Sequence, residues 1–196
     1  MLIDRTYFDG DLILTVSEPS QRAAVDAAIA TYEDEFLRKL LGPSLYDAFI
    51  AGLASGTGTP FSSQFSNQFG TGTVAQRWQW IRDGHTYTYG GRSYTWPGLK
   101  NSKKQSPIAN YTYWHYVKKN SRPTTQFGPS KGKVENATVV SPALELKDVW
   151  NEMVEWCQAL GYMLIYLELS GAPAYPEFNW AEVDGDLFEH QNLFGL

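Results

Sequence analysis

The sequence is poor in cysteine: Cys157 is the only one among 196 residues. A single thiol excludes a disulfide within the chain and a zinc site built from several thiolates of the same chain. This usage is typical of a reducing compartment, so a cytoplasmic protein is expected. Cys157 follows Trp156 in an apolar segment without a basic neighbour, which predicts a buried, unreactive side chain.

Long apolar runs are also missing. The longest, from Tyr162 to Leu167, is far shorter than the roughly 20 residues that cross a bilayer. Acids at Asp4, Asp9 and Asp11 occupy the place where a secretory signal needs basic residues. The sequence therefore predicts neither a membrane span nor a leader.

Charged residues make up 19% of the chain, below the roughly 25% of ordinary globular proteins, while hydrophobic residues reach 43%. That apolar content excludes wholesale disorder, and 196 residues suit a single domain over 1–196. The 16 basic and 21 acidic residues give a net charge of −5. An acidic chain does not coat nucleic acid with its whole surface, although a local basic patch can still bind it.

The usual signatures of catalysis are absent. The histidines His85, His115 and His190 have no metal-binding spacing, and the GTGT segments at 56–59 and 70–73 lack the lysine and flanking elements of a phosphate loop. Neighbouring acids such as Glu152 and Glu155 are interpreted as a solvated helix face. We expect no enzyme, no metal and no cofactor.

Helical periodicity is the strongest positive signal. Apolar residues recur at steps of three and four, and serine, proline and glycine stand at the ends of the segments. Helices are predicted over Pro19–Leu41, Pro43–Leu53, Val74–Asp83 and Ser106–Lys119, and from Ser141 and Pro142 to about Ser170. Gly42 and Pro43 separate the first two as a tight corner.

A β-hairpin is predicted over residues 85–96. The segments HTYTY and RSYTW alternate polar and aromatic residues around Gly90 and Gly91, which suit the positive φ angles of a two-residue turn. An isolated hairpin is marginal in water, so this one must pack on the helices or pair with a strand of another subunit. The expected fold is mainly α, a bundle of four or five helices with one long C-terminal helix, a small hairpin and long loops.

Two segments, 54–73 and 123–140, are predicted to be flexible arms, because they are polar, rich in glycine and without helical period. The first carries Phe61, Phe65 and Phe69, which either dock onto a neighbouring molecule or pack on the core of the same chain. Residues 171–196 hold aromatic side chains and acids but no Lys or Arg, and predict an irregular acidic tail on the surface.

Positive charge is concentrated between residues 100 and 133. This stretch has no acid and eight bases, namely Lys100, Lys103, Lys104, Lys118, Lys119, Arg122, Lys131 and Lys133. Three interpretations stay open: contact with another copy or partner, a solvated basic face, or nucleic-acid contact aided by the interleaved Tyr111, Tyr113, Trp114 and Tyr116. The candidate partner contacts are Phe61, Phe65, Phe69, Lys103, Lys104, Lys118, Lys119, Arg122, Lys131 and Lys133.

The run YEDEFLRKLLGPSLYDAFIAGL, in which a helix ending in LLG turns straight into LYDAF, resembles the start of the head–tail connector (adaptor) proteins of tailed phages and prophages. The helix SPIANYTYWHYVKKN, the loop ending in ENATVVSP and the long WNEM-containing helix are similar in order to those of connectors from phages of gut Bacteroidetes. The resemblance covers roughly residues 20–53 and 106–170. The hairpin at 85–96 and the acidic tail go beyond the minimal all-helical connector.

The resemblance implies a small helical structural protein in the virion neck, present in the host cytoplasm during assembly. Its partners would be the portal protein and the head-closure or tail proteins. Copies would form a ring, although a chain expressed alone can remain a monomer, and DNA would pass through without specific binding. Two other function classes stay open. One is a binding module for glycan or nucleic acid that uses Trp78, Trp80, Trp96 and Trp114, and the other is a glycan or peptide hydrolase.

Overall fold

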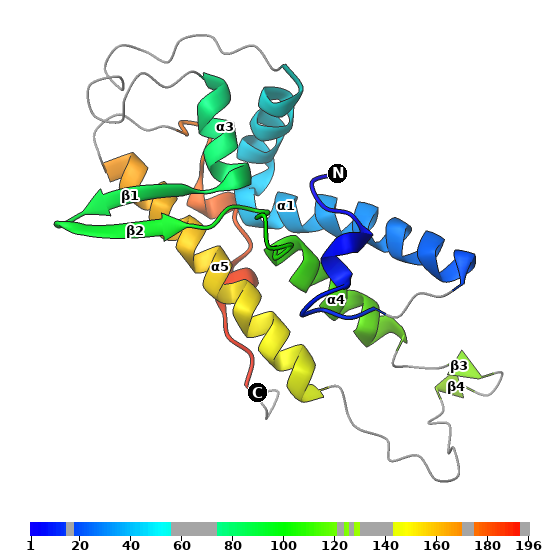
Figure 1. Cartoon of the computed structure of the whole chain (residues 1–196). Coiled ribbons are helices and arrows are strands. Elements are labelled where there is room, and N and C mark those ends of the chain that lie inside the picture. Colours follow the sequence, from blue (N-terminus) through cyan, green and yellow to red (C-terminus); the bar gives the residue numbers. More distant parts are fainter. Residues whose placement is uncertain are drawn as a thin grey trace.

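The structure is a computed structural model that describes residues 1–14, 18–55, 74–120, 124–125, 128–129, 143–169 and 175–192. Helices dominate these ranges, and the strands form two small antiparallel pairs (Figure 1). The elements in chain order are η1 (Arg5–Phe8), α1 (Pro19–Ser55), α3 (Val74–Asp83), β1 (His85–Tyr89), β2 (Arg92–Trp96), α4 (Pro107–Asn120), β3 (Thr124–Thr125), β4 (Gly128–Pro129), α5 (Ala143–Leu169), η2 (Trp180–Glu182) and η3 (Gly185–Phe188). The predicted mainly α fold with a hairpin is confirmed. None of these helices is long and apolar enough to cross a membrane.

The predicted helix–corner–helix at the start of the chain is present as the two halves of α1. The backbone leaves the helical region at Gly42, whose φ of 74° and ψ of 155° bend the helix there. The predicted apolar positions Val25, Ile29, Phe36, Leu40, Leu45, Tyr46 and Phe49 are buried. Ile50, expected in the same buried stripe, is instead 41% exposed. Helix α1 continues through Ala54 and Ser55, so the first two residues of the predicted 54–73 arm are helical.

Helix α4 lies between α1 and α5 and contacts both (Figure 1). Its predicted start is confirmed: Ser106 Oγ accepts from the amide of Ile108 at 3.1 Å and donates to the carbonyl of Leu99 at 2.6 Å. Ile108 and Tyr111 are buried, and the buried amide of Asn110 donates to the carbonyl of Val149 in α5 at 3.2 Å. This cap and cross-helix bond fix α4 at the centre of the bundle.

Helix α5 is the predicted long C-terminal helix, and it has 27 residues. Of the apolar positions expected to face the core, Val149, Met153, Leu160, Met163 and Leu167 are buried, while Leu146 and Trp156 are partly buried. Cys157 is fully buried, as predicted, and burial raises the pKa of its thiol. The N-terminal cap predicted for α5 at Ser141 and Pro142 lies outside the described residues.

The predicted hairpin is confirmed with a two-residue turn. Gly90 and Gly91 have φ angles of 57° and 77°, and Tyr89 pairs with Arg92 across the turn. Trp96 anchors its base, because this fully buried side chain donates from Nε1 to the carbonyl of Ile81 at 3.0 Å. The hairpin leaves the helices at one end of the molecule and runs beside the C-terminal part of α5 (Figure 1).

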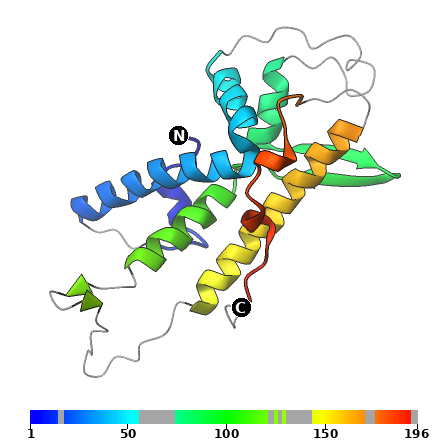
Figure 2. The ribbon, with the colours of Figure 1, turned by 180° about the vertical axis from the view of Figure 1, so that it is seen from behind.

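The acidic tail differs in one respect from the irregular surface segment predicted for it. Residues 175–192 contain the turns η2 and η3, and Tyr175 and Leu187 are buried in the common core. The tail runs along α5 and reaches the corner of α1 (Figure 2). Trp150 Nε1 donates to the carbonyl of Glu189 at 3.0 Å, which ties the tail to α5.

Most of the predicted arms lies outside the described residues. Within 123–140, Thr124–Thr125 and Gly128–Pro129 pair as the short antiparallel strands β3 and β4.

Candidate interaction surface

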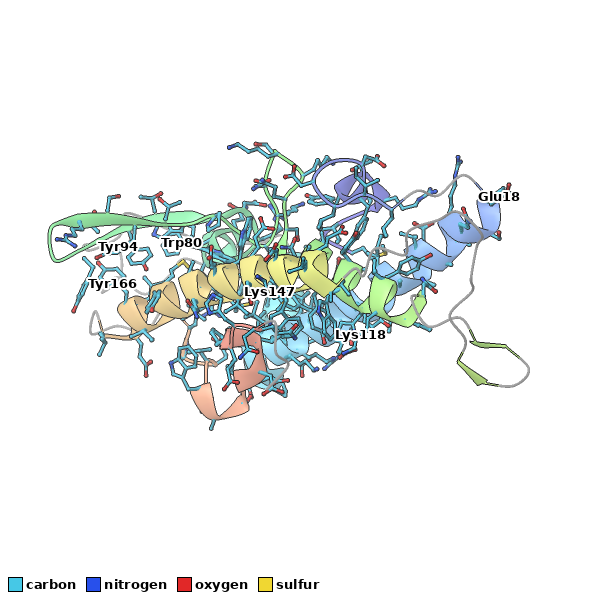
Figure 3. The ribbon with its side chains drawn as sticks, turned by 90° about the horizontal axis from the view of Figure 1, so that it is seen from below. Glu18, Trp80, Tyr94, Lys118, Lys147 and Tyr166 are labelled. Carbon is cyan, nitrogen blue, oxygen red and sulfur yellow. The ribbon has the colours of Figure 1, made fainter. Side chains whose placement is uncertain are left out.

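An open aromatic pocket of about 390 Å³ lies between the hairpin and the C-terminal part of α5. We call its lining the tyrosine surface, which consists of Tyr87, Tyr89, Tyr94, Tyr162, Ile165, Tyr166 and Leu169. Three of these side chains are mostly in solvent: Tyr89 is 59% exposed, Tyr162 is 65% exposed and Leu169 is 72% exposed. Figure 3 shows Tyr94 and Tyr166 close together at this end of the molecule. Exposed apolar side chains gathered in this way are typical of an interaction site.

Ring stacking holds the tyrosine surface in place. Tyr87 and Tyr94 are directly opposite each other in the hairpin, with ring centroids 5.7 Å apart. Tyr87 also stacks on Tyr166 of α5 at 4.9 Å, and Tyr89 meets the same ring edge-on at 5.7 Å. Offset and edge contacts of this kind stabilise aromatic pairs by about 0.5–1.5 kcal/mol beyond area burial. The surface is therefore preorganised before any partner arrives.

The hairpin has a different chemistry on its other face. Thr86 pairs with Thr95 and Thr88 with Ser93, and all four are exposed. The hydroxyls of Thr86 and Thr95 are hydrogen-bonded at 3.0 Å. The strands thus turn their aromatic side chains towards α5 and their hydroxyls towards solvent, as the two-residue period of a strand requires.

Two of the four tryptophans that the sequence suggested for binding are buried, and the other two are partly exposed. Trp78 and Trp96 are buried in the core. Trp80 stacks on His85 with centroids 4.1 Å apart, and Trp114 packs against Trp150 at 4.9 Å. The open aromatic pocket is lined by tyrosines and by none of these four tryptophans. The sequence signal for these tyrosines was the alternation of polar and aromatic residues in the hairpin, which places Tyr87 and Tyr89 on the same face.

The predicted basic contacts form two groups. Lys103 and Lys104 lie in the loop before α4, whereas Lys118 and Lys119 lie at its C-terminal end. The 14 residues of α4 separate the groups by about 20 Å at 1.5 Å per residue. Lys104 Nζ lies 5.0 Å from the ring centre of Tyr7, and Lys118 Nζ lies 3.9 Å from that of Trp114. The four lysines of this set that the structure describes thus present positive charge at the two ends of α4.

The other predicted contacts lie outside the described residues, and the structure neither groups nor separates them. They are Phe61, Phe65, Phe69, Arg122, Lys131 and Lys133.

A second hollow lies between the N-terminal half of α1 and the C-terminal end of α4. We call it the α1–α4 groove; its volume is about 360 Å³, and its lining is Ala24, Ala27, Ala28, Thr31, Tyr32, Tyr116, Lys119 and Asn120. The sequence offered little sign of it, because the alanines on α1 resemble ordinary helix surface.

Tyr111, Glu35 and Lys39 form a polar clamp between α4 and α1. Tyr111 Oη donates to Glu35 at 2.7 Å and accepts from Lys39 at 3.2 Å, and Lys39 pairs with Glu35 at 3.1 Å. Burial lowers the pKa of the adjacent His115, which favours its neutral form. Within the described residues no group of three or more His, Cys, Asp and Glu side chains is placed to hold a metal ion.

Comparison with protein-family models, curated proteins and solved structures gave no match to this chain. The resemblance to phage connectors therefore stays an expectation, and the tyrosine surface and the α1–α4 groove are the features on which a function must be argued.

Proposed function

We propose that the chain is a structural subunit of a phage or prophage head–tail connector, a ring between the portal and the head-closure or tail proteins. The observation that carries the proposal is the tyrosine surface, a preorganised and open aromatic patch beside a projecting hairpin. Tyrosine provides large contact area at a low entropic cost, and aromatic residues are enriched in protein interfaces. The rest of the described core is packing and clamps, which suits an assembly component.

The charge distribution supports the same proposal. Lys118 and Lys119 lie at one end of α4, while the described tail from residue 175 carries acids and no Lys or Arg. Opposite charges at separate places on a molecule favour association of unlike surfaces. In the proposed role, these faces meet other subunits and virion proteins in the neck, and the acidic chain lets DNA pass without specific binding.

The direct test is coexpression with the portal protein of the same phage or prophage, followed by mass measurement and cross-linking. We expect a complex larger than either component alone. The variant Lys118→Glu with Lys119→Glu should reduce its yield by about tenfold, because it reverses the charge of a face that the proposal assigns to contacts in the neck. Lys103→Glu with Lys104→Glu is the matched pair at the opposite end of α4. A chain that never associates with portal, head-closure or tail proteins would contradict the proposal.

A second candidate function is favoured by the same pocket. Open tyrosine rings can stack on sugars or on unpaired bases, so the chain could be a glycan- or nucleic-acid-binding module. Titration with oligosaccharides and single-stranded oligonucleotides, followed by intrinsic fluorescence, separates the two functions. A connector should give no saturable change, whereas a binding module should saturate and lose affinity in Tyr94→Ala.

A further inference from the structure

We propose that the tyrosine surface of one copy docks onto the α1–α4 groove of the next copy, so that copies associate head to tail. This inference rests on the proposed function, because it names the contact that would close the ring. Each surface is an open hollow in the single chain, with volumes of about 390 and 360 Å³.

The first argument is placement. Figure 3 shows Tyr94 and Tyr166 near one end of the molecule and Lys118 and Glu18 near the other. A contact between two different patches repeats from copy to copy and generates a ring when the rotation closes. A contact of the tyrosine surface with itself would instead give a closed twofold dimer and leave the groove open.

The second argument is fit between the side chains. The groove is lined on α1 by Ala24, Ala27 and Ala28, whose short side chains leave room for a partner's rings. Tyr32 and Tyr116 also line it and can pack edge-on against incoming tyrosines. On the other surface, Tyr162 and Leu169 project into solvent and offer apolar area to bury.

The third argument is charge. Lys119 lines the groove, and Lys118 precedes it at the same helix end. On α5, Glu155 and Glu168 are exposed within about two turns of Tyr162. Docking would bring lysines near carboxylates, which favours this pairing over contact between two identical ends.

Paired cysteines provide the test, because Cys157 is fully buried and leaves the surface free of native thiols among the described residues. The full-length variant Tyr162→Cys with Ala27→Cys carries one thiol on each proposed surface. The two positions lie on opposite ends, so they cannot join within one molecule. Mild oxidation should give a ladder of dimers, trimers and longer species.

The matched control is Ile50→Cys with Ala27→Cys, since Ile50 is an exposed apolar residue of α1 outside both surfaces. We expect the proposed pair to link about tenfold faster than the control, through the raised effective concentration at a real contact. Equal rates would overturn the inference. So would faster linking of Tyr162→Cys alone, which indicates a twofold dimer.

The experiment is carried out on the chain alone and on the chain coexpressed with its portal protein, because a chain expressed alone can remain a monomer. Equal linking rates in both settings overturn the inference, whereas association with the portal is measured separately and tests the proposed function. If the chain joins the portal but the two cysteine pairs link at equal rates, the proposed function stands and the proposed contact between copies is wrong. If the chain forms the ladder but never associates with neck proteins, the contact between copies stands and the proposed function is wrong.

Discussion

At the residue scale, Tyr111 is the centre of the bundle's polar clamp. Its side chain is 1% exposed and its hydroxyl meets Glu35 of α1 and Lys39 one turn later. Tyr111 follows the buried Ile108 at a step of three, which puts both side chains on the same side of the helix. The partners could not be predicted, because Glu35 lies 76 positions away and its neighbour Glu33 has the same chemistry.

Tyr111→Phe should lower the free energy of unfolding by about 1.5–3 kcal/mol, because it removes both hydrogen bonds of the Tyr111 hydroxyl while Lys39 still pairs with Glu35. Chemical denaturation at neutral pH measures the loss. Tyr162→Phe, at an exposed position, is the control and should leave stability unchanged. An equal effect of both variants would contradict the role of the clamp.

The same clamp gives a pH dependence. Burial raises the pKa of Tyr111 from its ordinary 10.0 to about 12, and the Glu35 carboxylate adds to the rise. Below pH 10 both the folded and the unfolded chain keep the proton of the Tyr111 hydroxyl, so its contribution to the free energy of unfolding has its full value. Between pH 10 and about 12 only the unfolded chain releases it, so the free energy of unfolding falls. Tyr111→Phe should make this fall shallower, although Tyr46, whose pKa is also raised to about 12, preserves part of it.

The candidate site shows where residue-level prediction from sequence ends. Alternation in the hairpin placed Tyr87 and Tyr89 on one face, but periodicity alone does not reveal that Tyr166 of α5 stacks there. Trp78 and Trp96 were among the four tryptophans suggested for binding glycan or nucleic acid. Both are core residues, since large apolar side chains serve burial equally well.

At the element scale, the corner at Gly42 decides how the two halves of α1 are arranged. Its φ of 74° lies in the left-handed region that favours glycine. The tail completes the corner: the amide of Asp184 donates to the carbonyl of Lys39 at 2.9 Å, and the Glu182 carboxylate accepts from the amide of Ser44 at 3.1 Å. The tail thereby satisfies one carbonyl at the end of the first half-helix and one amide at the start of the second.

Gly42→Ala should lower the free energy of unfolding by about 1–3 kcal/mol, because alanine is strained at this backbone conformation. Its Cβ would also stand 2.8 Å from Cβ of Glu182 and displace the tail. Thermal unfolding followed by circular dichroism measures the change. Gly10→Ala is the control, since a Cβ there meets nothing within 4 Å. Unchanged stability of Gly42→Ala would show that the corner can be built another way.

The elements themselves were largely predictable. Serine and proline at 106 and 107 marked the start of α4, and two glycines marked the hairpin turn. These signals are local, and local chemistry decides caps and turns. Ile50 was misplaced because it belongs to the apolar stripe by spacing, whereas no described neighbour covers that side of α1 enough to bury it.

At the scale of the whole molecule, the tail links helices that are distant in sequence. Leu187 is 1% exposed, and the turn η3 that holds it packs on α5, while η2 packs on α1. Composition predicted only an acidic tail at the surface. Its docking depends on contacts such as Ser44 with Glu182, 138 positions apart, which no local pattern records.

Leu187→Ala should therefore destabilise the whole fold by about 2–5 kcal/mol, the range for a buried leucine. Unfolding followed separately by circular dichroism and by tryptophan fluorescence should give coincident transitions at a lower midpoint. Leu144→Ala, at a position that is 57% exposed, is the matched control. A midpoint equal to that of the parent chain would mean that the tail is not part of the cooperative unit.

The closure of the Gly42 corner by Glu182 and Asp184 also bears on biosynthesis. The ribosome makes Ser44 138 positions before Glu182, so the nascent helix pair leaves the exit tunnel with its bend uncapped. The hydrogen bonds from Glu182 and Asp184 to the corner can form only after the tail has been translated. Until then the amide of Ser44 and the carbonyl of Lys39 are accessible to a chaperone or to a neighbouring nascent chain.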